Sequence, residues 1–434
     1  MTAKYINFKS AVNKGICSGC GVCAYSKSSK IKMEENKYGQ ITPKIVGVLS
    51  DDDYTLLNKI CPFSENSLDK KIDLSESENL VGRYIDSYAG YVKEKTYRDT
   101  GSSGGIGSWL LSELITRKIV DSVVHVKKSR KNDSLFEFSI SNSTNEVIEG
   151  ASSKYYPVTM DEVLKIISCS DKLFAIIAVP CFVRAVRNLI EVDEVIRKRI
   201  KVVGSLYCGH LKTSGYSKYI ADSIMFDHGE LLDIDFRLKA DSEKSSNYKT
   251  EVTTSKGKFT EFRQKIKGTN WGLGMFKYKS CDFCEDVSGE LADFSIGDAW
   301  LPKYEADDKG TNLLIVRSKV ILDIINSSQE RLYLDTISES DLYTAQAGGY
   351  RHKREGIHVR NEVMSLISGH QVKCRFEKVN PSRSRKVIYT YRMFMRRFSD
   401  LHYYFRASKF TFRLFELCVS LLSKIHGALI KIAR

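Results

Sequence analysis

Three cysteines near the start of the chain have the spacing of a metal-binding loop. Cys17, Cys20 and Cys23 are each separated by two residues, and Cys61, which precedes a proline, supplies a fourth thiol. Thiols at this spacing are typical of iron–sulfur ligation, whereas zinc sites usually combine two separated pairs. The spacing therefore predicts an iron–sulfur cluster, with a zinc site or plain structural cysteines as the alternatives. Lys27 stands where a two-cluster ferredoxin motif would place its fourth cysteine, so we expect this segment to bind one cluster.

A second group of thiols is spread over the middle of the chain. Cys281 and Cys284 are two residues apart, while Cys181 and Cys208 each follow an apolar run typical of a buried parallel strand. The carboxyl ends of parallel strands meet at one edge of an α/β sheet. We therefore expect these four thiols to converge and to bind a second cluster. Buried cysteines that only fill space after a strand are the alternative interpretation.

A turn rich in serine and glycine lies between a predicted strand at residues 88–93 and a helix that begins near Trp109. It contains Ser102, Ser103, Gly104 and Gly105. Free backbone amides at such a turn, together with the positive end of the following helix, favour an anion such as pyrophosphate. A serine that only caps the helix is equally compatible with the pattern. The turn has neither the spacing of a Walker phosphate loop nor a complete dinucleotide-binding fingerprint.

Strand and helix patterns alternate over most of the chain, which predicts an α/β fold, α+β overall. We expect hairpins over residues 30–43 and 135–149, a helix over 51–60, and mostly helical structure over 319–380. Residues 64–80 are polar and are expected to form a linker. The expected parts are a small ferredoxin-like iron–sulfur domain, the two parts of an open α/β domain, a helical extension and a basic helical tail, at residues 1–80, 81–165, 166–330, 331–380 and 381–434.

The positive charge of the chain is concentrated at its end. Residues 381–434 contain twelve Lys and Arg residues against Asp400 and Glu416, and therefore carry +10 of the formal net charge of +14. Apolar residues recur there at helical spacing, as in basic amphipathic helices that contact a membrane surface or an acidic partner. A helical cap on the body of the protein is the alternative. No nucleic-acid partner is expected, and the lack of a signal-peptide pattern after Met1 favours the cytoplasm.

Taken in order, these motifs resemble those of the coenzyme F420 hydrogenase/dehydrogenase beta-subunit family. The resemblance covers roughly residues 10–320. The motifs that carry it are Cys17-Ser-Gly-Cys-Gly-Val-Cys23, Cys61-Pro62, Ser102-Ser-Gly-Gly105, Ser153-Lys-Tyr-Tyr-Pro157, Val179-Pro-Cys181, Cys208-Gly-His210, Cys281-Asp-Phe-Cys284 and Ala292-Asp-Phe-Ser-Ile-Gly-Asp-Ala-Trp300. The chain is most similar to family members found beside polysaccharide-assembly genes in bacteria.

The resemblance implies an iron–sulfur flavoprotein that relays electrons between two 4Fe-4S clusters, FAD and a hydride donor or acceptor. The cluster ligands that it implies are Cys17, Cys20, Cys23 and Cys61 for one cluster, and Cys181, Cys208, Cys281 and Cys284 for the other. The flavin-site residues that it implies are Ser102, Ser103, Gly104, Gly105, Ser153, Lys154 and Tyr155, with Lys154 as the candidate catalytic residue. Whether the deazaflavin is a substrate is left open.

The expected function is therefore an oxidoreductase, with polysaccharide biosynthesis as the setting that the resemblance implies. Ferredoxin or a partner redox subunit is the expected electron donor, and the basic tail predicts a peripheral contact with the inner membrane face. Two other functions fit the sequence. One is a non-catalytic electron-transfer subunit that docks on a partner enzyme, and the other is a zinc-stabilised binding module.

Overall fold

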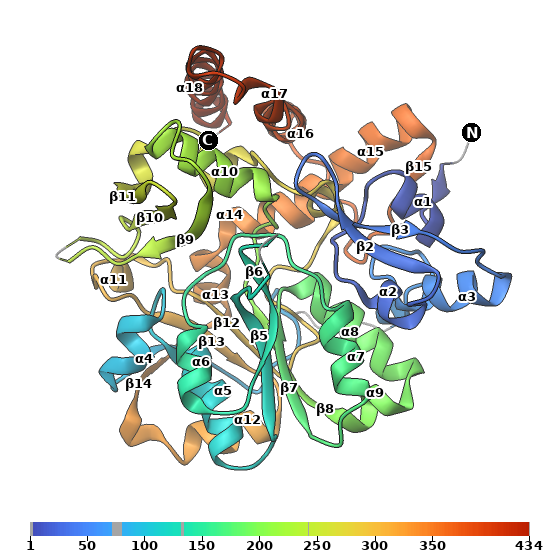
Figure 1. Cartoon of the computed structure of the whole chain (residues 1–434), viewed down its shortest axis with the longest axis vertical. Helices are drawn as coiled ribbons and strands as arrows, with labels where there is room; N and C mark the ends of the chain where they lie inside the picture. The colour runs from blue at the N-terminus through green and yellow to red at the C-terminus, as the bar shows by residue number, and fades with distance from the viewer. Residues whose placement is uncertain (1–2, 72–79, 132–133, 242, 434) are drawn as a thin grey trace.

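The computed structural model of the chain describes residues 3–71, 80–131, 134–241 and 243–433. Its centre is a mixed sheet of eight strands in the order β14-β4-β13-β12-β8-β7-β5-β6 (Figure 1). Four neighbouring strands of this sheet run parallel, namely β5 (Ser122–Lys128), β7 (Phe174–Ala178), β8 (Ile200–Leu206) and β12 (Phe294–Asp298). The expected α/β fold, with parallel strands before Cys181 and Cys208, is confirmed.

Antiparallel strands extend the parallel centre on both sides. β6 (Phe136–Ser141) pairs with β5, whereas β13 (Asn312–Val316), β4 (Asp86–Val92) and β14 (Leu332–Thr336) continue the sheet beyond β12. β7 and β13 are buried along their whole length. Such continuous burial is expected for strands that are covered on both faces.

Helices cover both faces of this sheet. Side chains of β7 alternate between two different cores, because successive residues of a strand point to opposite faces. One core contains α5 (Ile106–Thr116) and α12 (Lys319–Asn326). The other core contains α7 (Asp161–Ser168) and α8 (Pro180–Val192). The sheet is therefore the middle layer of three.

The N-terminal region packs against the α7–α8 face of the sheet. It contains the expected hairpin, formed by β2 (Ile31–Glu35) and β3 (Ile41–Ile45), and the expected helix, α3 (Asp51–Ile60). Two shorter helices, α1 (Phe8–Asn13) and α2 (Val22–Ser26), precede the hairpin. Apolar side chains of this region share one continuous core with α7, α8 and β7. The first cysteine segment is therefore held against the large sheet by a shared core.

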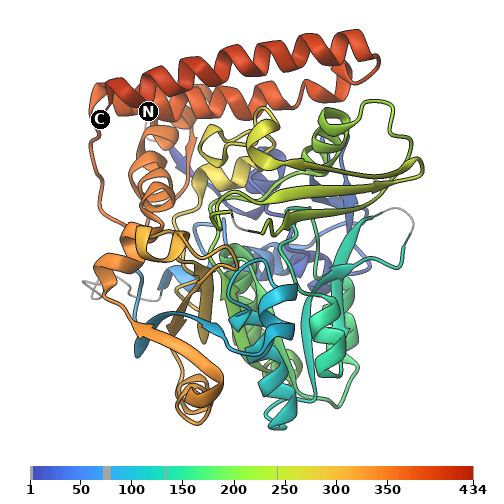
Figure 2. The ribbon, with the colours of Figure 1, turned by 90° about the vertical axis from the view of Figure 1, so that its left-hand side faces the viewer.

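The C-terminal tail forms a helical pair above a second, smaller sheet (Figure 2). This sheet is antiparallel and contains β9 (Leu231–Leu238), β10 (Lys249–Thr254) and β11 (Gly257–Phe262). Two tail helices pack on the core of the smaller sheet: α16 (Arg383–Ser399) contributes the buried Met395, and α18 (Lys409–Ile432) contributes the buried Phe412 and Phe415. The tail is thus the packed helical cap that the sequence had left as an alternative. Among the residues described, no helix is long and apolar enough to cross a membrane.

Two expected elements differ in the structure. The prediction of a hairpin over 135–149 was wrong, because β6 is followed by α6 (Thr144–Glu149), whose N-cap Ser143 accepts a hydrogen bond from the Glu146 N–H. The region 319–380 contains β14 as well as helices, since pairing with β4 recruits it into the sheet. The expected linker falls partly outside the described residues, which omit 72–79, and its described part includes a 3-10 helix, η1 (Leu68–Lys71).

The remaining elements connect these parts. β1 (Lys4–Tyr5) pairs in parallel with β15 (His370–Gln371), so the first described residues are held against a segment far along the chain. The other helices are α4 (Lys95–Thr100), α9 (Glu194–Arg199), α10 (Ser214–Ile224), α11 (Pro302–Glu305), α13 (Glu339–Ala345), α14 (Ala347–Tyr350), the π-helix η6 (Arg351–Glu355), α15 (Gly356–Ser368) and α17 (His402–Phe405). The short 3-10 helices η2 (Arg263–Lys265), η3 (Trp271–Leu273), η4 (Lys279–Phe283) and η5 (Gln329–Arg331) complete the fold.

A buried ion pair ties the segment after Cys61 to α8. The Arg184 side chain contacts the Asp69 carboxylate and also donates a hydrogen bond to the Pro62 carbonyl at 3.0 Å, and both charged side chains are at most 4% exposed. Asn188, one turn further along α8, accepts a hydrogen bond from the Asp69 N–H at 2.8 Å. Burial alone would raise the pKa of Asp69, but the Arg184 guanidinium holds it below its usual value. The pair therefore stabilises the fold at neutral pH and ceases to do so as the pH falls and Asp69 is protonated.

The Asp69→Ala variant should lose about 3–5 kcal/mol of its free energy of unfolding, because it leaves Arg184 buried without a carboxylate. Urea denaturation followed by circular dichroism measures the loss. Asp171→Ala is the matched control, since Asp171 pairs with Arg199 at 2.7 Å but is fully exposed, and it should have little effect. Equal losses in the two variants would contradict the role assigned to the buried pair.

Candidate functional site

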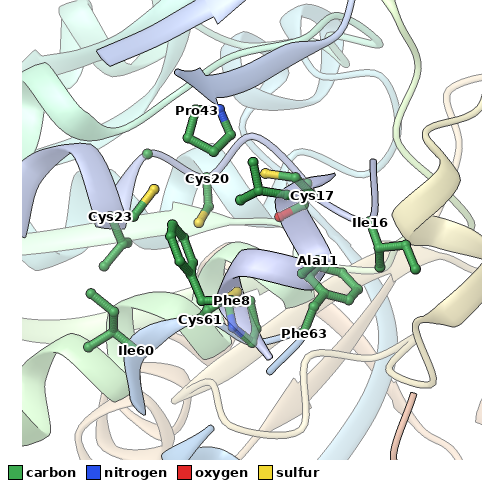
Figure 3. A pocket seen from close by; sticks show the side chains of 15 residues that line it. Phe8, Ala11, Ile16, Cys17, Cys20, Cys23, Pro43, Ile60, Cys61 and Phe63 are labelled. Carbon is green, nitrogen blue, oxygen red and sulfur yellow. The ribbon is translucent and has the colours of Figure 1, made fainter. Parts of the chain in front are cut away.

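The structure brings Cys17, Cys20, Cys23 and Cys61 together, and we call them the first thiol set. All four line one pocket, with Cys23 in α2 and Cys61 at the end of α3 (Figure 3). Apart from Ser18, every other residue that lines this pocket is apolar or glycine. The sequence spacing had predicted this convergence. The result is a set of four sulfur donors that face a space with apolar walls.

Two glycines determine the path of the loop that carries these thiols. Gly19 and Gly21 have φ angles of +78° and +83°, which L-residues rarely adopt. A Cβ atom at Gly21 would lie 2.2 Å from the Thr159 Oγ1 atom, and one at Gly19 would lie 2.7 Å from the Ile41 carbonyl oxygen. The Gly19 N–H donates a hydrogen bond to the Cys17 sulfur at 3.3 Å. Glycine therefore allows the backbone both to turn and to point an amide at a sulfur.

Burial disfavours the thiolate form of Cys17, Cys20 and Cys23 in the first set. It raises the pKa of Cys20 to about 12, and it also raises the pKa of Cys17 and Cys23 well above the usual value. The neighbouring thiols act in the same direction, because each would repel a thiolate beside it. A bound metal centre would reverse this balance, since its positive charge stabilises the thiolate form.

The structure also brings Cys181, Cys208, Cys281 and Cys284 together, and we call them the second thiol set. Cys181 lies in the first turn of α8, Cys208 follows β8, and the other two lie in and just after η4. All four are buried. Burial is the main cause that raises the pKa of Cys181, and repulsion from the other three cysteines of the set raises it further. The Leu211 N–H donates a hydrogen bond to the Cys281 sulfur at 3.2 Å. The predicted meeting of these thiols at the carboxyl edge of the parallel strands agrees with their positions in the structure.

One charged residue beside the second thiol set was missed by the sequence analysis. Lys353 in η6 is 1% exposed, and its ammonium group lies 3.5 Å from the Cys284 sulfur and donates a hydrogen bond to the Asp286 carbonyl. Although burial lowers the pKa of Lys353, the charges of the neighbouring thiolates raise it above its usual value. No cysteine or glycine pattern marks this segment, so only the tertiary structure could identify the lysine.

A tyrosine that the sequence analysis also missed lies between the two thiol sets. Tyr278 is 2% exposed, and its hydroxyl oxygen accepts a hydrogen bond from the Ile41 N–H at 2.8 Å. Burial raises the pKa of Tyr278, and both Cys17 of the first set and Cys281 of the second set raise it further. Members of the two sets also belong to one hydrophobic core. The two sets are therefore neighbours inside a single water-poor region.

The serine- and glycine-rich turn and the loop at 153–155 come together as the resemblance implied. The Ser153 N–H donates a hydrogen bond to the Ser102 hydroxyl at 2.7 Å. Gly105, with a φ of +81°, is the N-cap of α5. The first amide of that helix, the Ile106 N–H, already donates a hydrogen bond to the Asn312 side chain at 3.1 Å. Part of the hydrogen-bonding capacity of the turn is therefore used within the fold.

Lys154 lies within its own loop. Its ammonium group donates hydrogen bonds to the carbonyls of Gly150 at 3.2 Å and Ser152 at 3.1 Å, and also to that of Ala151. Burial lowers the pKa of Lys154 to about 8. The neighbouring Tyr155 ring packs 4.8 Å from the Trp271 ring. The observed contacts assign Lys154 to the organisation of this loop, and its catalytic role stays a prediction.

Geometry for a single metal ion is not found in the described parts of the chain. Among the residues described, no group of three or more His, Cys, Asp or Glu side chains could hold one ion. An iron–sulfur cluster is larger than an ion, and cysteines bind it at separate iron atoms.

The fold resembles that of a known redox complex. A chain of the F420-reducing NiFe hydrogenase complex from Methanosarcina barkeri, solved with xenon, superposes with a TM-score of 0.51. The two chains are 14% identical over 68% of this chain and 97% of that chain, so the likeness shows the fold alone. No curated protein sequence matches this chain.

The sequence itself places the chain in a family. Residues 87–165 match the model for the N-terminal part of the coenzyme F420 hydrogenase/dehydrogenase beta subunit, and residues 171–341 match the model for its C terminus. Together these matches span more than half of the chain, and the chain belongs to this family of oxidoreductase subunits. The resemblance inferred from the motifs is confirmed. The second thiol set lies inside the matched residues, whereas the first thiol set lies before them.

The Gly21→Ala variant should lower the free energy of unfolding by several kcal/mol, because its Cβ atom would collide with the Thr159 side chain as well as requiring a positive φ. Gly15→Ala is the matched control. Gly15 has a φ of +67° with nothing within 4 Å of an added Cβ, so this variant should lose only about 1–2 kcal/mol. Urea denaturation of both variants measures the difference. A Gly21→Ala variant as stable as Gly15→Ala would show that the loop is not tightly packed.

Proposed function

We propose that the chain is an iron–sulfur flavoprotein oxidoreductase that relays electrons between two 4Fe-4S clusters, FAD and a hydride donor or acceptor. The single observation that carries the proposal is the gathering of eight cysteines, six of them buried and Cys17 and Cys61 partly buried, into two sets of four that adjoin in one core. The match to a family of oxidoreductase subunits supports the same conclusion. When bound, the clusters supply one-electron transfer and the flavin links it to hydride chemistry.

The chain's own residues fit these groups. Each thiol set supplies the four soft donors that one cubane requires, and the walls around the first set are apolar. The amides of Gly19 and Leu211 donate to sulfur atoms of the first and second sets. Hydrogen bonds to sulfur and exclusion of water are the means by which a protein adjusts the potential of such a centre. Tyr278, which neighbours both sets, is itself buried.

For the flavin, the proposed site is the turn Ser102, Ser103, Gly104 and Gly105 with the loop Ser153, Lys154 and Tyr155. The hydrogen bond between Ser153 and Ser102 supports one joint site. The turn precedes α5, so a pyrophosphate there would face the positive end of the helix. In this proposal Lys154 holds the loop in shape, and its positive charge favours an anionic group beside it.

The proposed partners follow from the same features. Ferredoxin or a second redox subunit would exchange electrons with the first thiol set, which lies outside the family match. The resemblance to polysaccharide-locus members supports a sugar or lipid-linked sugar as the substrate. Exposed apolar residues on the basic α18, such as Leu417 and Leu421, support contact of the tail with a membrane surface.

A second candidate function is a non-catalytic electron-transfer subunit. The observation that favours it is the fold likeness to a chain of a hydrogenase complex. Purified protein that holds flavin and iron but reduces a substrate only after a partner enzyme is added would support this candidate. Turnover by the chain alone, with a chemical electron donor, would support the first proposal.

Anaerobically purified protein should contain about eight iron atoms and eight sulfides per chain and absorb visible light as iron–sulfur proteins do. Bound FAD is expected with them. Cys20→Ala and Cys281→Ala should each lose about half of the iron, because each variant removes a ligand from one set only. Iron, sulfide, zinc and flavin analysis measures these contents.

The control for these variants is Cys169→Ser, which changes an exposed cysteine outside both sets and should retain all the iron. A colourless protein that contains zinc would contradict the proposal. Loss of all iron in both single variants, with the fold intact, would contradict two separate clusters.

The Lys353→Met variant should shift the reduction potential of one cluster to a more negative value. The reason is that the lysine charge beside Cys284 stabilises the reduced form, which carries one more negative charge. Redox titration followed by electron paramagnetic resonance measures the potential. Lys353→Arg keeps the charge and should restore most of the original value, whereas equal shifts in both variants would indicate a packing effect.

A further inference from the structure

A cavity of about 370 Å³ lies in the C-terminal part of the chain, and nothing assigned so far uses it. Its walls come from α14, η6, α16 and α18, all of which follow residue 341, where the family match ends. The residues that line it are Gly348, Arg351, His352, Arg385, Ile388, Tyr389, Arg392 and Ile430. We call this cavity the arginine pocket. Its volume lies in the range of pockets that bind small molecules.

Positive charge in the arginine pocket exceeds the negative charge around it. Arg385 pairs with Glu355 at 3.1 Å. Arg351 and Arg392 form no ion pair with a carboxylate among the residues described. The nearest recorded partners of the Arg392 side chain are imidazole nitrogens, His426 Nε2 at 3.1 Å and His352 Nδ1 at 3.4 Å. Two of the three guanidinium groups are therefore left without a counter-charge.

The two histidines do not supply that counter-charge. Burial, with the nearby Arg392, lowers the pKa of His426 to about 4, and burial with the surrounding cations lowers the pKa of His352 well below its usual value. Both rings are consequently neutral at pH 7. Their neutral nitrogens accept hydrogen bonds from Arg392 and hold its guanidinium group at the pocket wall.

The surroundings of the pocket add to the positive charge. His352 contacts the Lys277 ammonium at 3.3 Å. Lys277, Arg360 and Arg396 all surround the single carboxylate of Asp282, at 2.5, 3.8 and 2.9 Å. Buried charges are normally paired, because leaving them unpaired in a medium of low polarity is costly. The region is thus built to receive an anion from outside the chain.

We propose that the arginine pocket binds a small molecule that carries a phosphate or diphosphate group. Planar guanidinium groups bind phosphate oxygens in pairs, and two uncompensated arginines match a group with two negative charges. Ile388, Ile430 and the Tyr389 ring line the remaining volume, which suits an organic portion attached to the phosphate. The proposal rests on the pocket alone and holds whether or not the chain carries clusters.

The position of the pocket connects it with the second thiol set. His352 lines the pocket, whereas the next residue, Lys353, contacts Cys284. Consecutive Cα atoms are about 3.8 Å apart, so the residue that lines the pocket and the residue that contacts the thiol are direct neighbours in η6. A ligand in the arginine pocket therefore lies beside the residues proposed to transfer electrons.

The test is calorimetric titration of the purified full-length chain with inorganic pyrophosphate. The parent chain should bind it, and Arg351→Gln and Arg392→Gln should each weaken binding by about tenfold or more, because each removes a charge-assisted contact. Arg392→Lys keeps the positive charge but cannot donate two parallel hydrogen bonds. Its affinity for pyrophosphate should therefore lie between that of the parent chain and that of Arg392→Gln. Arg397→Gln removes the same charge from an exposed site on α16 outside the pocket, and should bind as the parent does.

No binding by the parent chain would overturn the proposal. An equal loss of pyrophosphate affinity in Arg397→Gln would also overturn it, because it would indicate a general attraction of pyrophosphate to the basic tail. Thermal unfolding shows which variants are folded. If Arg392→Gln is unfolded, Arg351→Gln decides the test, because the Arg351 side chain is exposed and its loss leaves no buried charge unpaired.

Discussion

The gathering of eight thiols, six of them buried, into two neighbouring sets is the constraint on which the rest of the structure depends. A buried thiol has little affinity for metal until its proton is lost, and the raised pKa values show that the apolar surroundings resist this loss. A metal centre with several positive charges would supply the missing stabilisation. The glycine loop, the edge of the parallel strands and the Asp69–Arg184 pair hold the segments that carry the thiols in place.

Residues after 341, where the family match ends, contact the second thiol set, which lies inside the match. The sheet of the matched part places the second thiol set, but Lys353 in η6 contacts it from outside that part. Arg396 of the tail pairs with Asp282, which stands between two of these thiols in the sequence. The tail therefore contacts the segment that carries Cys281 and Cys284. The residues that line the arginine pocket also follow residue 341.

The sequence could predict those parts of the site that local patterns determine. Cys181 and Cys208 follow apolar runs, and the geometry of parallel strands requires the ends of such runs to meet. Lys353 and Tyr278 could not be found in this way, because their positions depend on packing between segments distant in the chain. The same reason explains β14, because the five residues Leu332–Thr336 complete the sheet through pairing with β4, which lies far from them in the chain.

Two separate iron centres, one in each thiol set, are the core of the proposed function. Anomalous diffraction at the iron absorption edge, from crystals grown without oxygen, tests it directly. We expect two distinct groups of iron peaks, one surrounded by Cys17, Cys20, Cys23 and Cys61 and the other by Cys181, Cys208, Cys281 and Cys284. A map with no iron peak at either set, or with a single zinc peak in its place, would contradict it.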